Sequence, residues 1–287
     1  MKLIKQSFEI LDQQCGLEGI YKQIEVVGRT CYKSEDKITE DSAKGFVDRM
    51  IKSGHGAMLE HGTVYLEFHV KDPSEVGEDE YHSQQAFLNK LINKYADNKY
   101  SIVRVNHYYD TTFITTNYRV LVENNWLDDL KYICEPTFFH EKRITVRFIC
   151  DRGVSHEYVR HRVFSFAQES TRYCNYSKDK FNHEITFIEP LWLYNKWNDD
   201  DNIAKDYFRQ VCEQSESYYF SLLKEGWKPQ EARAVLPNAL KTELVMTGFV
   251  SDWKNFFELR DTASAHPQAQ ELAHPLHEAF IQRGLVK

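Results

Sequence analysis

The chain lacks the glycine-rich loops with which many proteins hold nucleotide phosphates. Its 287 residues include only 12 glycines and 7 prolines, and no GxGxxG or GxxxxGKS/T pattern occurs. A Rossmann or P-loop cradle is therefore not expected, and side chains would have to hold any nucleotide. A Ser/Gly linker, an internal repeat and a low-complexity tract are also missing. We therefore expect one domain over residues 1–287.

Long apolar runs and closely paired cysteines are absent as well. No stretch approaches the roughly 18 consecutive apolar residues of a membrane span, and the opening MKLIKQSFEI has charges where a signal peptide is apolar. The six cysteines form no CxxC pair, and a chain of this length needs no disulfide staples. With 42% hydrophobic and 14% aromatic residues, the chain is not disordered. These features predict a cytoplasmic protein with reduced thiols and no membrane contact.

A metal-binding helix is not expected either. His156, Glu157 and His161 resemble the HExxH motif of zinc proteases, but the two histidines are five residues apart instead of four. At about 100° per residue, the two imidazoles of a helix would lie about 140° apart, on different faces. The segment therefore predicts no metal site.

What the sequence has is a concentration of arginine. Residues 143–172 contain six arginines and no lysine, although the whole chain carries a net charge of −7. The planar guanidinium group suits bidentate contact with phosphate or with the carbonyl groups of a heterocycle. The alternative is a face on which these side chains spread into water. The absence of lysine favours a polyanionic ligand. The arginines are Arg143, Arg147, Arg152, Arg160, Arg162 and Arg172.

The hydrophobic pattern predicts strands early in the chain and helices late. Strict alternation over Thr63–Val70 and Arg143–Cys150 is typical of half-buried strands. Asp151 is placed to cap a helix that carries Glu157 and Arg160. We expect another strand at 184–188 and a short β-rich stretch between 98 and 119. The other expected helices are 40–53, 78–98, 119–133, 201–225, 229–235, 239–249, 252–261 and 268–283. This order indicates an α+β fold.

Five motifs, taken together, resemble the flavin-dependent thymidylate synthases. The signature of that family is RHR, seven residues, and then Ser, which Arg160-His161-Arg162 and Ser170 match. Four further matches follow the order of the family and extend over most of the chain. They are Gly28–Tyr32, Leu59–His61, Arg233–Pro237 and Asn255–Arg260.

The resemblance implies a fold, an assembly and a reaction. The fold would be that of the family, a mixed sheet with flanking helices, assembled as a homotetramer whose active sites combine several subunits. The reaction would be the methylation of dUMP to dTMP in nucleotide biosynthesis. Methylenetetrahydrofolate would supply the carbon, and NADPH would reduce FAD, which would supply the hydride. These ligands are small anions, and no nucleic-acid partner is implied.

The resemblance also implies site residues. Arg260 would polarise the uracil ring by stabilising charge on its nitrogen 3 and carbonyl, and His61 would lie near the folate and uracil. Ser170 would bind substrate without attacking it, since a serine without an adjacent base is a poor nucleophile. The residues expected at FAD are Thr63, Arg160, His161, Arg162, Gln168 and Asn255. Those expected at dUMP are Glu157, Arg160, Gln168, Glu169, Ser170, Thr171, Arg172, Arg233 and Arg260.

The chain departs from the family pattern in several places. Gln168 and Glu157 stand where some relatives carry the opposite choice of acid or amide, so their proton roles stay open. Phe249 replaces a polar flavin contact, and His266 follows Arg260 at a longer spacing than in compact members. His61 and Arg160 are 99 positions apart, farther than in compact members, which predicts an insertion at about 72–142.

Three other functions agree less well with the sequence. A nucleic-acid-binding module would use the arginine-rich segment, but the net charge of −7 argues against it. An inactive, flavin-binding relative would not require every arginine of the motif, but all of them are present in this chain. The cysteine-dependent thymidylate synthases carry a Pro-Cys-His context, which this sequence lacks.

Overall fold

The computed structural model describes residues 1–106, 108, 110–195 and 203–287. It forms two compact units, each assembled from separate stretches of the chain. Unit 1 comprises residues 1–11, 29–34 and 146–287, and unit 2 comprises residues 12–28 and 35–145.

Unit 2 is built on a three-stranded antiparallel sheet in the order β3-β5-β4. The register places Ile114 of β5 opposite Leu66 of β3 and Val103 of β4, so apolar side chains share one face. The strands are β3 (Thr63–His69), β4 (Ile102–Asn106) and β5 (Thr111–Asn117). The helices are α1 (Gly16–Tyr32, to residue 28 in this unit), η1 (Glu35–Lys37), α2 (Ser42–Lys52), α3 (Gly56–Leu59), α4 (Pro73–Val76), α5 (Glu78–Ala96), α6 (Tyr118–Glu123) and η2 (Leu127–Tyr132).

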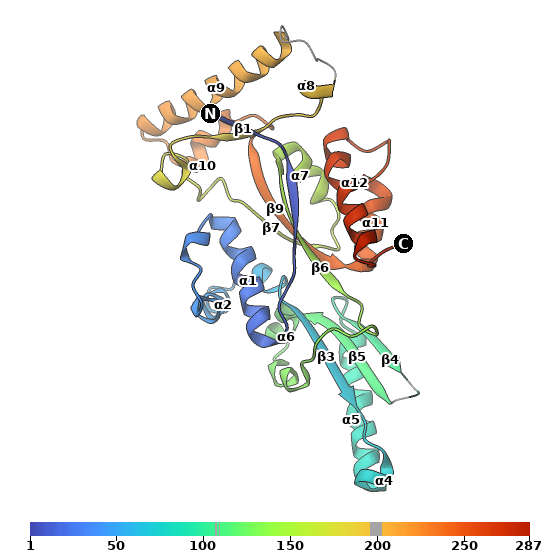
Figure 1. Ribbon diagram of the computed structural model, residues 1–287. Helices are drawn as coiled ribbons and strands as arrows, with labels where there is room; N and C mark the ends of the chain where they lie inside the picture. The colour runs from blue at the N-terminus through green and yellow to red at the C-terminus, as the bar shows by residue number, and fades with distance from the viewer. Residues whose placement is uncertain (107, 109, 196–202) are drawn as a thin grey trace. The chain divides into compact units, whose positions relative to one another are not determined.

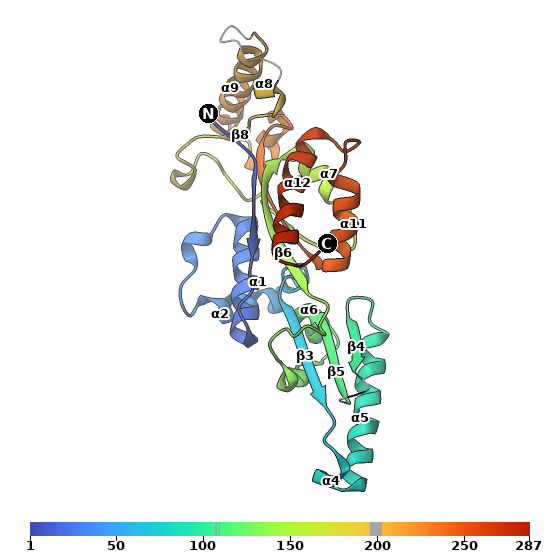
Figure 2. The ribbon, with the colours of Figure 1, turned by 45° about the vertical axis from the view of Figure 1, so that its right-hand side comes forward.

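The core of unit 2 lies between this sheet and its helices. Ile24 of α1, Val47 of α2 and Tyr95 of α5 are fully buried and belong to the same cluster as Leu66 and Ile114. Figure 2 shows α5 running beside β4 and β5, which it contacts. Residues 72–142 all belong to this unit. That they form an insertion stays a prediction, as does the single domain over 1–287.

Unit 1 contains a four-stranded sheet in the order β2-β6-β9-β7 and a separate parallel pair, β1-β8. The strands are β1 (Lys2–Ile4), β2 (Ser7–Leu11), β6 (Arg143–Asp151, from residue 146 in this unit), β7 (Ser165–Gln168), β8 (Thr186–Ile188) and β9 (Lys241–Phe249). The helices are α7 (Arg152–Tyr158), η3 (Asp179–Phe181), α8 (Trp192–Asn195), α9 (Ile203–Lys224), α10 (Pro229–Ala232), η4 (Arg233–Val235), α11 (Val250–Arg260) and α12 (Pro267–Gln282).

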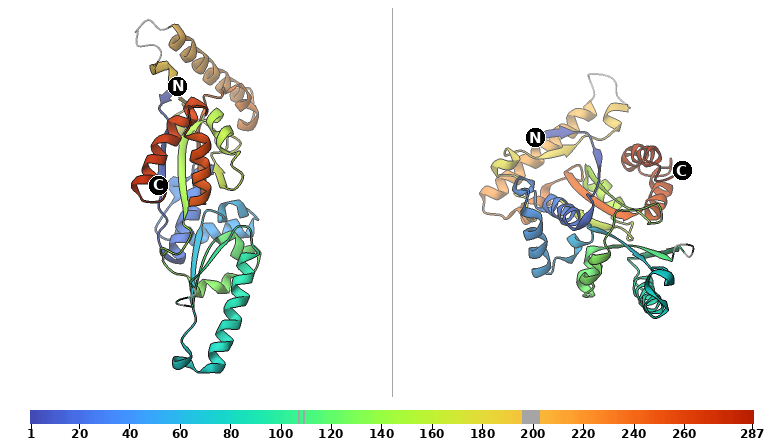
Figure 3. Two further views of the ribbon diagram at one scale, coloured as in Figure 1. Left: turned by 90° about the vertical axis from the view of Figure 1, so that its right-hand side faces the viewer. Right: turned by 60° about the horizontal axis from the view of Figure 1, so that its bottom comes forward.

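An aromatic cluster joins the sheet of unit 1 to three helices. Phe148 of β6 contacts Tyr158 of α7 and both Trp253 and Phe256 of α11. Phe280 of α12 packs on Trp253, with 5.4 Å between the ring centroids. Figures 1 and 3 show α11 and α12, drawn in red, side by side against the sheet. Burial of these large rings fixes the ends of α7 and α11.

A second core of unit 1 lies under α9. Cys212 and Tyr219 of α9 are buried in one cluster with Tyr176, Phe187 of β8 and Leu240. This cluster anchors the segment that leads away from β7. Cys212 and the other five cysteines are free thiols.

Most of the expected elements are present, and the α+β class is confirmed. The predictions for 40–53, 63–70 and 252–261 correspond to α2, β3 and α11. Asp151 caps α7 as predicted, since its Oδ1 accepts a hydrogen bond from Val154 N–H at 2.6 Å. The prediction for 201–225 corresponds to α9 from residue 203, and residues 201 and 202 lie outside the described residues.

Three expectations were wrong. The segment 239–249 is no helix: it contains strand β9, a strand of the sheet interior that is buried on both faces, so its apolar residues do not alternate with polar ones. The helix expected over 119–133 is interrupted where Asn125 adopts a positive φ of 58°. Arg160 lies beyond the end of α7. The sequence pattern also missed α1, β1, β2 and the four-residue strand β7.

Within the ranges that the structure describes, no helix combines the length and the apolar character needed to cross a membrane.

Gly248 of β9 lies under the ring of Phe164. A Cβ atom at residue 248 would lie 2.5 Å from Phe164 Cδ1, and that ring is confined by Trp253 at 4.6 Å between centroids. We predict that Gly248→Ala lowers the free energy of unfolding by about 1–3 kcal/mol, because the buried ring cannot move away. The urea midpoint would measure this loss.

The matched control is Gly45→Ala, since a Cβ atom there would meet only Arg49 Nη1, at 3.8 Å. It should leave the midpoint unchanged or raise it. Combining Gly248→Ala with Phe164→Leu should recover part of the lost stability. An unchanged midpoint for Gly248→Ala alone would contradict the packing argument.

Candidate active site

The N-terminus of α7 is fixed by hydrogen bonds within unit 1. Besides capping α7, Asp151 accepts a hydrogen bond from Gln268 Nε2 at 3.0 Å. One helical face of α7 is anchored by Tyr158, whose hydroxyl donates to the carbonyl of Ala269 at 2.8 Å. These contacts hold α7 against α12 and place Glu157 at the end of the helix.

Arg260, the last residue of α11, is held by Glu157 of α7 and by His161 of the RHR signature. Its Nη1 donates to Glu157 Oε2 at 2.8 Å, and its Nη2 donates to the Glu157 carbonyl at 2.9 Å. Its Nε donates to His161 Nε2 at 3.0 Å. A guanidinium group has five N–H donors. Three of them are used here, and the other two have no acceptor among the described residues.

His161 is a neutral imidazole in this arrangement. Burial and, to a smaller extent, the adjacent charge of Arg260 lower the pKa of His161 to about 4. Because Arg260 donates to Nε2, the ring carries its proton on Nδ1. The ring also packs on Phe256 at 5.1 Å. His161 therefore supports the cation as a hydrogen-bond acceptor.

Gln168, at the end of β7, joins three elements. Its Nε2 donates to Ser155 Oγ of α7 at 3.0 Å and to Thr242 Oγ1 of β9 at 3.2 Å. The antiparallel register of β7 and β9 pairs Gln168 with Leu244. The amide oxygen remains available for other contacts.

The segment after β7 carries most of the residues expected at dUMP. Ser170 N–H donates to the carbonyl of Cys31 at 3.0 Å, and Arg233 Nη1 donates to Thr171 Oγ1 at 2.7 Å. The Arg172 guanidinium lies over the ring of Tyr173, 5.4 Å from its centroid. The structure thus brings Thr171 and Arg233, 62 residues apart in the chain, into contact.

Several of the expected ligand-binding side chains face solvent. Arg160, Arg162, Arg172, Arg233 and Asn255 are all exposed. Among residues 1–106, 108, 110–195 and 203–287, neither Arg160 nor Arg162 pairs with a carboxylate. Exposed guanidinium groups on either side of buried His161 are well suited to bind an anion.

The other two expected site residues, His61 and Thr63, belong to unit 2, and both are buried. Thr63 Oγ1 accepts a hydrogen bond from Arg143 Nη1 at 3.3 Å. Gln13 holds the backbone of Thr63 through two hydrogen bonds of 2.8 Å. His61 N–H donates to the carbonyl of Met58 at 3.2 Å.

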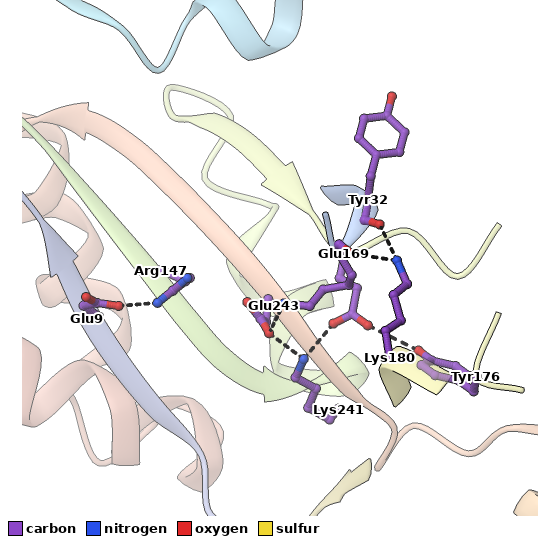
Figure 4. A network of polar contacts seen from close by, with 9 residues as sticks. Glu9, Tyr32, Arg147, Glu169, Tyr176, Lys180, Lys241 and Glu243 are labelled. Atoms are coloured by element: carbon purple, nitrogen blue, oxygen red, sulfur yellow. Dashed lines mark hydrogen bonds and ion pairs between the residues drawn. The ribbon is translucent and has the colours of Figure 1, made fainter. Parts of the chain in front are cut away.

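The sequence analysis missed a group of buried charges beside this segment. Lys241 Nζ lies 2.9 Å from Glu169 Oε2 and 2.6 Å from Glu243 Oε1, and Lys33 Nζ lies 2.8 Å from the same Glu243 oxygen. Figure 4 shows Lys241 between the two carboxylates. Burial by itself would lower the pKa of Lys241, but Glu169 and Glu243 raise it above its ordinary value. Lys241 is therefore charged at neutral pH.

The prediction of a strand in place of a helix over residues 241–249 would have revealed this group. Lys241 and Glu243 are two residues apart, so they share one face of β9. In the helix that was expected there, they would lie about 200° apart around the axis. Because a helix was expected over 239–249, the ion pair between Lys241 and Glu243 was not predicted.

Within the described chain, no group of three or more His, Cys, Asp or Glu side chains is arranged to hold a metal ion. The polar groups that converge in unit 1 are mainly guanidinium, amide and hydroxyl groups. The protein is thus of the α+β class, and its candidate site is rich in arginine.

The model of the family described as "Thymidylate synthase complementing protein" matches residues 90–283, and the chain belongs to that family. The chain is similar to the flavin-dependent thymidylate synthase of Pyrococcus furiosus, with 31% identity over 140 residues, 47% of this chain and 52% of that protein. It is 30% identical over 137 residues to the enzyme of that name from Corynebacterium efficiens, covering 46% and 54% of the two chains.

A probable flavin-dependent thymidylate synthase of Paramecium bursaria Chlorella virus 1 is 26% identical over 153 residues, 51% of this chain and 69% of the viral protein. The chain spans about half the length of the Pyrococcus and Corynebacterium relatives. The family named in the sequence analysis is thereby confirmed.

The neutral state of His161 predicts a pH dependence of stability. Unfolded histidine has a pKa near 6.5, whereas that of folded His161 is about 4. Between these values the unfolded chain binds the extra proton, so the free energy of unfolding falls as the pH drops from above 6.5 toward 4. The difference between a pKa of 6.5 and one of about 4 corresponds to about 3 kcal/mol of the free energy of unfolding.

His161→Gln retains an acceptor for Arg260 but does not titrate. Over the same pH range, the free energy of unfolding should fall by up to about 3 kcal/mol more in the wild type than in this variant. Urea unfolding at several pH values would measure both curves. Parallel curves would show that His161 is not held neutral by the fold.

Proposed function

We propose that the chain is a flavin-dependent thymidylate synthase, which methylates dUMP to dTMP with methylenetetrahydrofolate as carbon donor and NADPH as reductant of FAD. The observation that carries this proposal is the position of Arg260, which is fixed by Glu157 of α7 and by His161 of the RHR signature. Membership of the family and the printed names of the relatives support it.

The residues present fit an FAD molecule bound by side chains. Its pyrophosphate needs cations, and Arg160 and Arg162 offer exposed guanidinium groups without carboxylate partners in the described chain. When bound and reduced by NADPH, FAD would supply the hydride for the reaction. We propose that FAD is held by Thr63, Arg160, His161, Arg162, Gln168 and Asn255.

Arg260 is suited to stabilise negative charge on the uracil ring. Glu157 and His161 occupy three of its N–H donors, which leaves two for the nitrogen 3 and carbonyl region of the base. A cation that is already oriented needs no reorganisation when charge develops in the transition state. Carbon 5 of the ring thereby becomes nucleophilic without a covalent bond to the enzyme.

Ser170 would bind dUMP without acting as a nucleophile. Its Oγ accepts a hydrogen bond from Arg172 N–H at 3.3 Å, and the described structure places no basic side chain within hydrogen-bond distance of this oxygen. A serine hydroxyl needs an adjacent base to attack a substrate. Together with Ser170, we assign dUMP binding to Glu157, Arg160, Gln168, Glu169, Thr171, Arg172, Arg233 and Arg260, and a place near the folate to His61.

We further propose a cytoplasmic homotetramer with active sites shared among subunits. The family resemblance supports this assembly. Free thiols at all six cysteines are consistent with a reducing compartment.

Arg260→Ala tests the role of the guanidinium. We predict that the variant retains FAD and its oxidation of NADPH but forms dTMP at least about 100-fold more slowly, because the charge on uracil loses its partner. Flavin absorbance and chromatographic detection of dTMP would measure the two properties. Equal loss of flavin would contradict a role confined to the base.

A wild type that binds FAD and dUMP but never forms dTMP would overturn the proposed function.

Arg162→Ala tests the side-chain cradle for FAD. We predict that the purified variant loses most of its yellow flavin absorbance, since no glycine loop compensates for the lost cation. The matched control is Arg209→Ala, which removes an exposed arginine of α9 in the same unit. Full flavin content in Arg162→Ala would contradict this assignment.

A further inference from the structure

Four charged side chains form a continuous chain beneath the segment expected to bind dUMP. The order is Glu169, Lys241, Glu243 and Lys33, with successive N···O distances of 2.9, 2.6 and 2.8 Å. The two carboxylates balance the two ammonium groups. Glu169 is the most deeply buried, with only 2% of its side chain exposed. Tyr176 lies at the far side of this carboxylate, with its hydroxyl 3.5 Å from Oε1.

This network joins three separate stretches of unit 1. Glu169 N–H donates to the carbonyl of Glu243 at 2.8 Å, which continues the β7-β9 ladder by one residue. Next to Lys33, the carbonyl of Cys31 accepts from Ser170 N–H. Lys180 Nζ also donates to the carbonyl of Lys33, at 2.6 Å. The main chain of residues 168–170 is thus held on one side by β9 and on the other by residues 31–33.

The burial of Glu169 separates its role from that of its neighbours. Arg172 is exposed, and Ser170 is partly so, whereas the Glu169 carboxylate is enclosed and bonded to Lys241. The carboxylate is bonded to Lys241, so Glu169 would contribute to dUMP binding through its main chain. Removing Lys241 leaves the Glu169 carboxylate without its ion-pair partner and breaks its link to β9. Without this link, we expect the segment Ser170–Arg172 to shift.

We propose that Lys241 is a positioning residue for dUMP, acting through Glu169 on the segment Ser170–Arg172. This inference rests on the proposed function. It assigns Lys241 an effect on substrate affinity and none on the chemical step, because the network touches only the segment that binds the substrate. A merely structural ion pair would affect stability and leave substrate affinity unchanged.

The test compares steady-state kinetics of the FAD-loaded enzyme and Lys241→Gln. We expect the KM for dUMP to rise at least about 10-fold, while kcat at saturating dUMP stays within about 3-fold of the wild type, which is the pattern of lost uniform binding. Flavin content should not change. Lys241→Arg, which keeps the charge, should restore most of the affinity.

Lys94→Gln provides a matched control in unit 2. Lys94 pairs with Asp129, and 23% of its side chain is exposed against 16% for Lys241. This variant should lose stability and keep the wild-type KM for dUMP. If Lys241→Gln behaves like Lys94→Gln, the network is only structural and the proposal is overturned.

A second variant covers the case in which Lys241→Gln does not fold. Lys241→Met combined with Glu169→Gln removes both charges of the innermost pair, so neither is left unpaired. Because the link between Glu169 and β9 is still lost, we expect this protein to retain FAD and to bind dUMP at least about 10-fold more weakly in calorimetry. Wild-type affinity would overturn the role of Lys241. A wild type that forms no dTMP would instead contradict the proposed function.

Discussion

The neutral state of His161 is the condition on which the geometry of the candidate site depends. Arg260 donates from Nε to His161 Nε2, and this bond exists only while the imidazole nitrogen is unprotonated. Burial against Phe256 disfavours the charged ring, as the lowered pKa indicates. The aromatic core of unit 1 therefore does more than stabilise the fold. It keeps His161 as an acceptor, and it thereby fixes the direction of the Arg260 guanidinium.

The charged side chains of the candidate site and its surroundings in unit 1 fall into two groups. Buried ones are paired: Lys241 lies between Glu169 and Glu243, and Arg260 is held by Glu157. Buried ions need such partners, because desolvation of an unpaired charge is costly. Exposed ones, such as Arg160 and Arg162, keep their donors in solvent. The first group fixes the position of the main chain, and the second is free to exchange water for a ligand.

The sequence predicted those parts of the fold in which one face meets solvent. α2 and β3 were found because their apolar residues recur at helical or strand spacing. β9 was mistaken for a helix because it is buried on both faces, and its neighbour β7 is too short to show any period. Contacts such as Thr171 with Arg233 depend on strand order, which a single sequence does not specify.

The residues of the candidate site likewise include some that the sequence predicts and some that it does not. Arginines of the signature were identifiable because a ligand-facing cation needs a particular side chain at a particular spacing. Lys241 and Glu243 carry no such motif, since many arrangements of buried partners can hold the same segment. The ion pair of Lys241 with Glu243 can be recognised only once β9 is known to be a strand, in which the two side chains share a face. A site without a glycine loop thus needs both kinds of residue: those that meet the ligand, and those that hold the main chain between them in place.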